Sequence, residues 1–232
     1  MTRSPSWVAA VAAILAAVPQ WLRADEPASV TPTTAYSYCT LCHGAVGGGN
    51  VAIQAPALAG IEPWYLAEKL MAYREVHLGK DFAVDPAGTE MRTVAREVAE
   101  DRIPVIASYL TGFPLEPRPA TVSGNAGKGK TLFASHCAAC HGARAQGNAL
   151  LHAPGLSRLN DWYVVAAFRK YRTGARGAAT EDTWANQMHL NTQALPADFP
   201  IEDVSSYLNK LHAGELRREP RPRINPSRSP LR

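Results

Sequence analysis

The sequence contains little charge, few cysteines and no long apolar run beyond its first residues. Of its 232 residues, 46% are hydrophobic and 19% are charged. This balance excludes the disordered, collagen-like and long coiled-coil classes, and it allows one large domain or two small ones. No segment shows the alternating, β-branched pattern of a half-buried strand. No nucleic-acid-binding motif occurs either. An all-α fold without a nucleic-acid partner is therefore expected.

Positive charge is in excess but unevenly distributed. The formal net charge is +4, yet residues 25–113 contain six basic and eleven acidic residues, a net of −5. Residues 124–212 contain nine basic and six acidic residues, a net of +3, and the remaining excess lies at the two ends. This distribution does not give the continuous basic surface that follows a phosphate backbone. Opposite charges on the two parts instead favour protein partners.

Residues 1–24 have the features of a secretory signal peptide. Arg3 precedes an apolar run from Trp7 to Val18, and Ala24 is a small residue suited to cleavage. An uncleaved anchor is the alternative, but a run of about a dozen apolar residues is shorter than the roughly 20 that span a bilayer. We therefore predict export, cleavage after Ala24 and a periplasmic location.

All four cysteines lie in two copies of the motif Cys-x-x-Cys-His. The motif residues are Cys39, Cys42, His43, Cys137, Cys140 and His141. Two cysteines three positions apart lie on one face of a helical turn, where they can form thioethers with the two vinyl groups at one edge of a porphyrin. The histidine that follows can ligate the iron. This spacing predicts two covalently bound c-type haems.

Other uses of paired cysteines explain the pattern less well. A thioredoxin-like redox pair would follow a strand in a βαβ unit, and a zinc site would use two Cys-x-x-Cys knuckles. Neither explains a histidine directly after both pairs. Two disulfides, the first expectation in an exported chain, are disfavoured because the haem motif uses every cysteine.

The second motif belongs to a longer internal repeat. Adding 98 to a residue number carries Gly49 to Gly147 and Trp64 to Trp162, so the chain repeats one haem-binding unit. A Pro-rich stretch between the copies is typical of a stiff linker. The predicted parts are a signal peptide (1–24), a first domain (25–113), a linker (114–123), a second domain (124–212) and a basic tail (213–232).

Two methionines are predicted as the sixth iron ligands. Met91 and Met188 lie 48 and 47 residues after the histidines of their motifs. A thioether opposite histidine favours ferrous iron and raises the reduction potential. Methionine is also a common core residue, which is the interpretation for Met71, and His189 is the rival ligand to Met188. The histidines without a repeat partner are expected at the surface or in packing: His77, His136, His152 and His212.

Helix signals agree with this organisation. Helices are expected over residues 62–76, 101–111, 126–141, 161–171 and 200–211, with a shorter helix before the first motif. Asp161 is expected to cap its helix and Pro104 to lie in a first turn. Pro200 is expected to start the last helix and Gly214 to follow its end.

Several features together resemble the two-domain class I cytochromes c, in particular the cytochrome c4 family. They are the paired motifs, the Pro-x-Leu sequences, the Trp-Tyr and Tyr-Arg pairs, the late methionines and the final Tyr-Leu pairs, over about residues 30–212. The resemblance implies two tandem all-α domains, each around one haem, with the haem propionates near the interface. It also implies that the carbonyls of Pro56 and Pro154 accept hydrogen bonds from the axial histidines. Residues 81–101, Pro104 and residues 215–232 depart from the family pattern.

One-electron transfer is the expected function, because His and Met on both irons leave no position open for substrate. The favoured interpretation is a periplasmic carrier between respiratory partners. The donor would be a cytochrome bc1-type complex or a dehydrogenase, and the acceptor a terminal oxidase or reductase. The alternative is a di-haem electron-accepting subunit of a periplasmic dehydrogenase or of an oxidase complex. A haem enzyme such as a peroxidase would need an open iron. The basic tail is expected to be disordered, and its binding to an acidic partner or a membrane surface is a further hypothesis.

Overall fold

The computed structural model describes residues 32–75, 77–178 and 182–218. Within these ranges the chain is helical, with no strands and two isolated bridges, Asn50–Ala55 and Asn148–Ala153. None of the described helices is both long enough and apolar enough to cross a membrane. The predicted signal peptide lies outside the described residues.

The first half, residues 32–113, contains five α-helices and three short 3-10 turns. They are α2 (Pro32–Tyr36), η2 (Ser37–Cys39), α3 (Thr40–His43), η3 (Val51–Ile53), α4 (Pro63–Arg74), α5 (Pro86–Glu97), η4 (Glu100–Arg102) and α6 (Ile103–Leu110). Pro104 lies in the first turn of α6, as predicted, where its missing N–H has no helical partner to lose.

The second half, residues 124–218, repeats this order. Its elements are α7 (Ala126–His136), α8 (Ala138–His141), η5 (Ala149–Leu151), α9 (Asp161–Thr173), α10 (Thr183–Gln193) and α11 (Ile201–Arg218). The helix predicted over residues 126–141 is interrupted at Cys137, whose φ of −119° separates α7 from α8.

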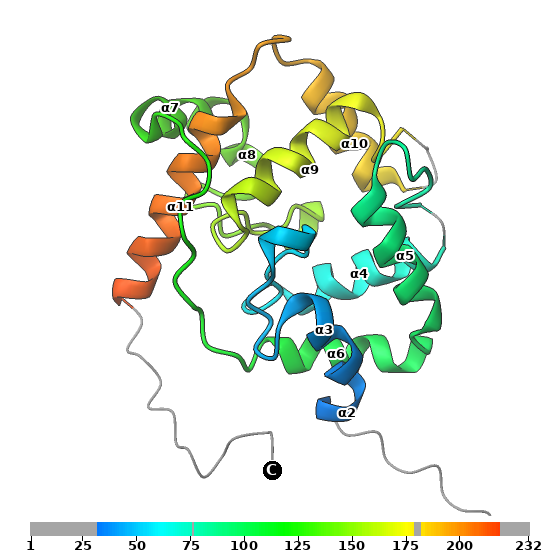
Figure 1. Cartoon of the computed structure of the whole chain (residues 1–232). Helices are drawn as coiled ribbons and strands as arrows, with labels where there is room; N and C mark the ends of the chain where they lie inside the picture. Colours follow the sequence, from blue (N-terminus) through cyan, green and yellow to red (C-terminus); the bar gives the residue numbers. More distant parts are fainter. Residues whose placement is uncertain (1–31, 76, 179–181, 219–232) are drawn as a thin grey trace, which may run out of the picture. The chain divides into compact units, whose positions relative to one another are not determined.

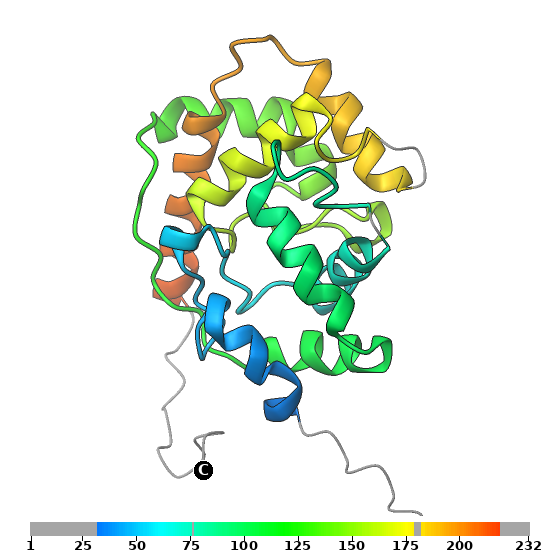
Figure 2. The same cartoon turned by 45° about the vertical axis from the view of Figure 1, so that its right-hand side comes forward.

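The helices pack in the same way in both halves. In the first half α4 contacts α5 and α6, and in the second half α9 contacts α10 and α11 (Figure 1). In addition, α11 packs along α7. The chain between α6 and α7 runs beside α11, as both views show (Figure 2). Two linker residues are bonded to α11: Glu116 accepts from His212, and Val122 accepts from Ser206.

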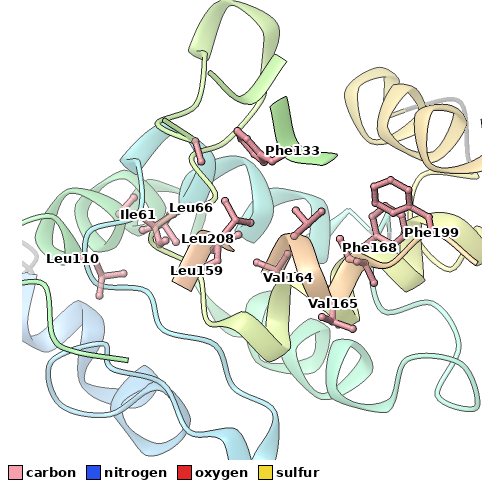
Figure 3. Close-up of a cluster of buried hydrophobic side chains, with 14 of the residues drawn as sticks. Ile61, Leu66, Leu110, Phe133, Leu159, Val164, Val165, Phe168, Phe199 and Leu208 are labelled. Carbon is pink, nitrogen blue, oxygen red and sulfur yellow. The ribbon is translucent and has the colours of Figure 1, made fainter. Parts of the chain in front are cut away.

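One buried hydrophobic cluster joins the two halves. It contains Leu66 and Leu110 from the first half together with Phe133, Val164 and Leu208 from the second (Figure 3). Each of these side chains is at most 8% exposed. Burying a side chain of this size contributes about 1.5–3 kcal/mol. The apolar positions of the two repeats therefore stabilise one shared core.

Two predicted helix ends are wrong. Asp161 is the first residue of α9 rather than its cap, since Asn160 occupies the cap position. The Asp161 carboxylate instead accepts hydrogen bonds from the linker, from the backbone N–H and hydroxyl of Thr121 and from Val122 N–H, at 2.6–3.0 Å. These bonds outweigh the effect of burial and lower the pKa of Asp161.

The last helix is longer than predicted, because α11 continues through Gly214 to Arg218. A glycine inside a helix costs about 1 kcal/mol relative to alanine. Beyond Gly214, Glu215 accepts a hydrogen bond from Ser157 and pairs with Arg158 at 3.7 Å. The start of the predicted disordered tail is therefore helical. Residues 219–232, on which the tail-binding hypothesis depends, lie outside the described residues.

Two helices that the sequence patterns did not predict carry the candidate methionine ligands. Met91 lies on α5 and Met188 on α10. Each helix begins after an aspartate whose carboxylate accepts a hydrogen bond from a backbone N–H in the first turn, Asp85 from Gly88 and Asp182 from Ala185. Residues 81–101, which depart from the family pattern, thus include one capped helix that presents Met91.

Candidate functional site

The first Cys-x-x-Cys-His motif is held by a short helix and a sharp turn. His43 ends α3, and Gly44 follows with a φ of +79°. The His43 side chain is buried, and its Nδ1 lies 2.8 Å from the carbonyl oxygen of Pro56. An N–H on Nδ1 donates to that carbonyl, which leaves Nε2 as the nitrogen available to a metal. Burial lowers the pKa of His43 more than this hydrogen bond raises it, so the ring is neutral and suited to ligation.

The second motif has the same geometry. His141 is buried at the end of α8, and its Nδ1 lies 2.8 Å from the carbonyl oxygen of Pro154. Burial again lowers the pKa of His141 more than the hydrogen bond raises it. Burial also raises the pKa of Cys137 to about 11, so this thiol is protonated at neutral pH. A protonated thiol is less suited to metal binding or redox exchange than the thiolates of zinc and thioredoxin-like sites.

A close chain crossing positions each proline carbonyl. Gly49 has a φ of +81°, and a Cβ built there would lie 2.5 Å from the backbone nitrogen of Ala57, next to Pro56. At the repeat position, Gly147 has a φ of +84°, and its Cβ would lie 2.5 Å from the backbone nitrogen of Gly155. Only glycine fits such a crossing. The structure therefore explains why both repeats carry glycine here.

One cavity in the first half brings the predicted ligands together. Cys39, Cys42, His43 and Met91 all line it, together with Pro56. Most of its remaining wall is apolar; the aliphatic lining residues include Leu58, Ile61, Leu66, Leu70, Val94 and Ile106. Two thiols, an imidazole and a thioether around an apolar space are the donor set that haem c requires. The residues present therefore fit this cofactor.

In the second half, Cys137 and Met188 both pack against the shared hydrophobic core and are half-buried. His189, the rival ligand to Met188, has its Nδ1 hydrogen-bonded to the backbone carbonyl of Tyr171. This bond ties the His189 ring to α9. As with His43 and His141, this bond leaves Nε2 as the nitrogen available to a metal, so Met188 stays the predicted ligand and His189 its rival.

The second half also contributes to the first cavity, which the sequence did not predict. Five residues from α9 and the turn after it line that cavity: Trp162, Tyr163, Ala166, Lys170 and Arg176. The only available signal was a break in the repeat, because Arg176 corresponds to Leu78 in the first half. The first candidate haem site is therefore completed by the other half of the chain.

Residues of the first half reach the second half in return. Trp64 on α4 packs edge-on against His152, with ring centroids 5.8 Å apart. His152 Nδ1 lies 2.8 Å from Glu68 Oε1, and its ring stacks on Trp184 at 4.5 Å. His152 was expected at the surface or in packing, and it is a packing residue between the halves.

Polar contacts to backbone groups fix the interface. Asn160 Oδ1 accepts from Ala57 N–H at 2.7 Å, and Arg158 donates to the carbonyl of Gly60 at 3.1 Å. Unlike exposed ion pairs, these bonds depend on a precise position of one half against the other. They allow the residues from α9 to serve as a fixed wall of the first cavity.

Positive charge is concentrated at this wall. Arg176 is 4% exposed and donates to the hydroxyls of Tyr73 and Tyr163, each at 3.2 Å. Burial by itself raises the pKa of Tyr163, but the nearby cations Arg176, Lys170 and Lys69 outweigh it and lower the pKa overall. The cavity wall contributed by the second half is therefore electropositive.

The fold is that of tandem class I cytochrome c domains. Residues 126–212 match the family model described as Cytochrome c, which implies covalently bound haem c. The predicted fold class is confirmed, and so is the resemblance to di-haem cytochromes c.

Solved structures of known cytochromes share this fold. Cytochrome c4 from Pseudomonas stutzeri has a TM-score of 0.60 and 24% identity, covering 78% of this chain and 97% of that one. Cytochrome c4 from Acidithiobacillus ferrooxidans has a TM-score of 0.59 and 24% identity, covering 75% and 98%. Thiosulfate dehydrogenase (TsdBA) from Marichromatium purpuratum has a TM-score of 0.58 and 24% identity, covering 74% of this chain but only 36% of that one.

Two curated relatives are oxidase subunits. One is the Cbb3-type cytochrome c oxidase subunit FixP of Sinorhizobium medicae (strain WSM419), 29% identical over 122 residues, which are 51% of this chain and 40% of the relative. The other is the subunit CcoP of Rhodobacter capsulatus, 24% identical over 190 residues, which are 77% of this chain and 60% of the relative. The chain thus spans less than two thirds of either relative.

Proposed function

We propose that this chain is an electron-transfer cytochrome that binds two haems c and has no catalytic site of its own. In the first half Cys39 and Cys42 would form the thioethers, and His43 and Met91 would ligate the iron. The corresponding residues of the second half are Cys137, Cys140, His141 and Met188. One observation carries this proposal. Cys39, Cys42 and His43 line the same cavity as Met91, which lies on a different helix, α5.

Haem c, when bound, supplies a one-electron Fe(III)/Fe(II) couple. The residues of the chain set the conditions for it. The carbonyls of Pro56 and Pro154 hold the tautomer and orientation of the two histidine rings. The Met91 thioether, as a soft ligand, and the apolar wall, which excludes water, would both favour the ferrous state, which carries less charge. Held by His43 and Met91, and by His141 and Met188, the two irons would have no position left for a substrate.

The proposed role is that of a periplasmic carrier between a donor, such as a cytochrome bc1-type complex or a dehydrogenase, and an oxidase or reductase acceptor. The names of the oxidase subunits and of thiosulfate dehydrogenase support redox protein partners in general. The acidic first domain and the basic second domain, net −5 and +3 over residues 25–113 and 124–212, support docking of different partners on the two halves.

The alternative function is that of an electron-accepting subunit of a dehydrogenase or an oxidase complex. It is favoured by the curated relatives, which are oxidase subunits longer than this chain. In this case the chain would stay bound to its partner, whereas a carrier would bind transiently and with strong salt dependence.

The experiment that tests both functions is purification of the native protein from the periplasm of its host at low salt. Haem content per chain, from the alkaline pyridine spectrum of the protein, is expected to be two, and one haem or none would contradict the di-haem proposal. A species of monomer mass that is reduced reversibly and does not react with peroxide supports the carrier. Co-elution with a flavin-, quinone- or metal-containing chain supports the subunit instead, and rapid turnover of peroxide contradicts both.

A further inference from the structure

A buried arginine breaks the repeat at the boundary between the two halves. Adding 98 to Leu78, which is 1% exposed, gives Arg176, which is 4% exposed. An apolar residue therefore fills this place in the first half, and a cation fills it in the second. Burying a guanidinium costs several kcal/mol unless it is well paired, so an arginine here needs a reason.

Arg176 contacts both halves of the chain, through the hydroxyls of Tyr163 and Tyr73. It follows the end of α9, where Gly174 has a φ of +81°, and its own N–H donates to the carbonyl of Lys170 at 3.0 Å. Its side chain lines the cavity that contains Cys39 and His43 of the first half. The second half thus places a cation in the wall of the first half's candidate haem site.

The partners of Arg176 do not neutralise it. Asp85 is the acidic side chain beside it, with Oδ2 3.8 Å from the guanidinium. The other oxygen of Asp85 already binds Lys170 at 2.5 Å and the N–H of Gly88 at 2.8 Å. One carboxylate therefore serves two cations, and the hydroxyls of Tyr73 and Tyr163 carry no charge to balance the second.

One donor of Arg176 is also unused. Its Nε is buried and has no hydrogen-bond partner among the described residues. A buried, unpaired N–H of a charged group is costly and is rare in folded proteins. An excess positive charge with a free donor at a cavity wall fits an acidic group on the molecule that fills the cavity.

We propose that Arg176 is a positioning residue for the haem of the first half, and that its guanidinium receives an acidic edge group of that haem, a propionate carboxylate. This inference rests on the proposed function in one respect, the presence of haem at Cys39 and Cys42. The cation stabilises the ferrous state, which has one positive charge less, and so raises the reduction potential of this haem. The repeat position of Arg176 holds Leu78, so the same contact to the second haem is not expected.

The test is redox titration of the full-length di-haem protein with three variants. Arg176→Gln and Arg176→Leu remove the charge, and the second places at this site the residue of the other repeat. Arg176→Lys keeps the charge. At a fixed ambient potential, the reduced-to-oxidised ratio of one haem is expected to fall about tenfold in the neutral variants, which is about 59 mV for one electron. The lysine variant should retain most of the native potential, and the second haem should be unchanged throughout.

The control is Arg158→Gln. Arg158 also crosses between the halves, since it donates to the carbonyl of Gly60, but it does not line the cavity. An equal fall in potential in this variant would show that loosened packing of the halves is responsible and would overturn the inference. Unchanged potentials in both neutral variants would overturn it as well, as would a fall in the potential of the other haem alone.

Assignment of the two potentials uses Met91→Ala, which should alter the haem of the first half. Haem content and the far-UV circular dichroism spectrum are measured for every variant. These measurements distinguish a failure of the proposed function from a failure of the inference about Arg176. Absence of the first haem from the unmodified protein contradicts the proposed function itself. Two haems with potentials insensitive to Arg176 contradict only the inference. If the glutamine variant does not fold, the leucine variant decides, because Lys170 still pairs with Asp85 in it and a buried leucine already occupies the repeat position, Leu78.

Discussion

Lys170 of the second half pairs with Asp85 of the first half at 2.5 Å, on the same carboxylate oxygen that caps α5. The pair has a counterpart across the repeat, where Lys69 of α4 lies 3.9 Å from Asp182, the cap of α10. Each helix that carries a candidate methionine ligand is therefore anchored at its N-terminus by a lysine of the other half. Packing of the halves and placement of the methionines are coupled by these contacts.

The two lysine pairs differ in burial, which predicts different effects of their loss. Lys170→Met leaves the Asp85 carboxylate, 3% exposed, with one cation fewer, and breaking a buried pair costs about 3–5 kcal/mol. Lys69→Met removes a longer and more exposed pair, with side chains 20% and 19% exposed, which costs at most about 1 kcal/mol. Chemical denaturation of the two variants measures the difference. Equal losses of stability in the two variants would contradict the larger contribution expected of the buried Lys170–Asp85 pair.

Of the three methionines after the initiator, we expect two, Met91 and Met188, to affect the ferric spectrum when they are replaced. Met91→Ala and Met188→Ala should each remove the long-wavelength ferric band of Met–iron ligation from one haem and lower its potential, because the soft thioether is lost. Met71→Ala is the matched control, since Met71 lies on α4 and does not line the first cavity. A ferric spectrum unchanged by Met188→Ala would show that another residue, with His189 the first candidate, ligates the second iron.

Much of the site was accessible from the sequence because it is encoded locally. The Cys-x-x-Cys-His motifs lie on single turns, and the repeat fixes the positions of Pro56 and Pro154 thirteen residues after each histidine. The helices α7, α9 and α11 have clear start signals. The helix α5 was missed because polar and charged residues surround its short apolar face, formed by Met91, Val94 and Ala95.

The contacts between the halves could not be predicted in this way. They join residues such as Glu68 and His152, which are 84 positions apart, and depend on how two similar units pack. A repeat shows which residues correspond, but not which face of one copy meets the other. The replacement of Leu78 by Arg176 was a visible signal, because a charged residue at a buried repeat position marks a difference in surroundings.

The glycine crossings predict a contrast between neighbouring glycines. Gly49→Ala would place a methyl group 2.5 Å from the backbone nitrogen of Ala57 at a positive φ, which costs on the order of 1–3 kcal/mol. It should also reduce haem incorporation, since the adjacent Pro56 carbonyl orients His43. Gly48→Ala meets nothing within 4 Å and should change the stability by less than about 0.5 kcal/mol. Thermal unfolding and haem content of the two variants test this. Equal values for both variants would show that the close approach of Gly49 to Ala57 does not require glycine.

His212 predicts how stability depends on pH. It is buried on α11, and Nε2–H donates to the carbonyl of Glu116 in the linker at 2.9 Å. Burial, and the nearby charges of Arg118 and Arg158, lower its pKa more than the Glu116 bond and Glu215 raise it. Below a pH of about 6.5 the unfolded chain gains a proton at this residue and the folded chain does not.

This histidine therefore stabilises the fold above a pH of about 6.5, and its contribution is lost as the pH falls through the depressed folded pKa. His212→Gln keeps a donor for the Glu116 carbonyl but cannot titrate. Its free energy of unfolding should decline less than that of the native protein between pH values of about 7.5 and 5, so that the two curves converge on acidification. Denaturant titrations at several pH values measure both curves. Parallel curves would mean that His212 gains its proton as readily in the folded chain as in the unfolded one, which its burial among Arg118 and Arg158 opposes.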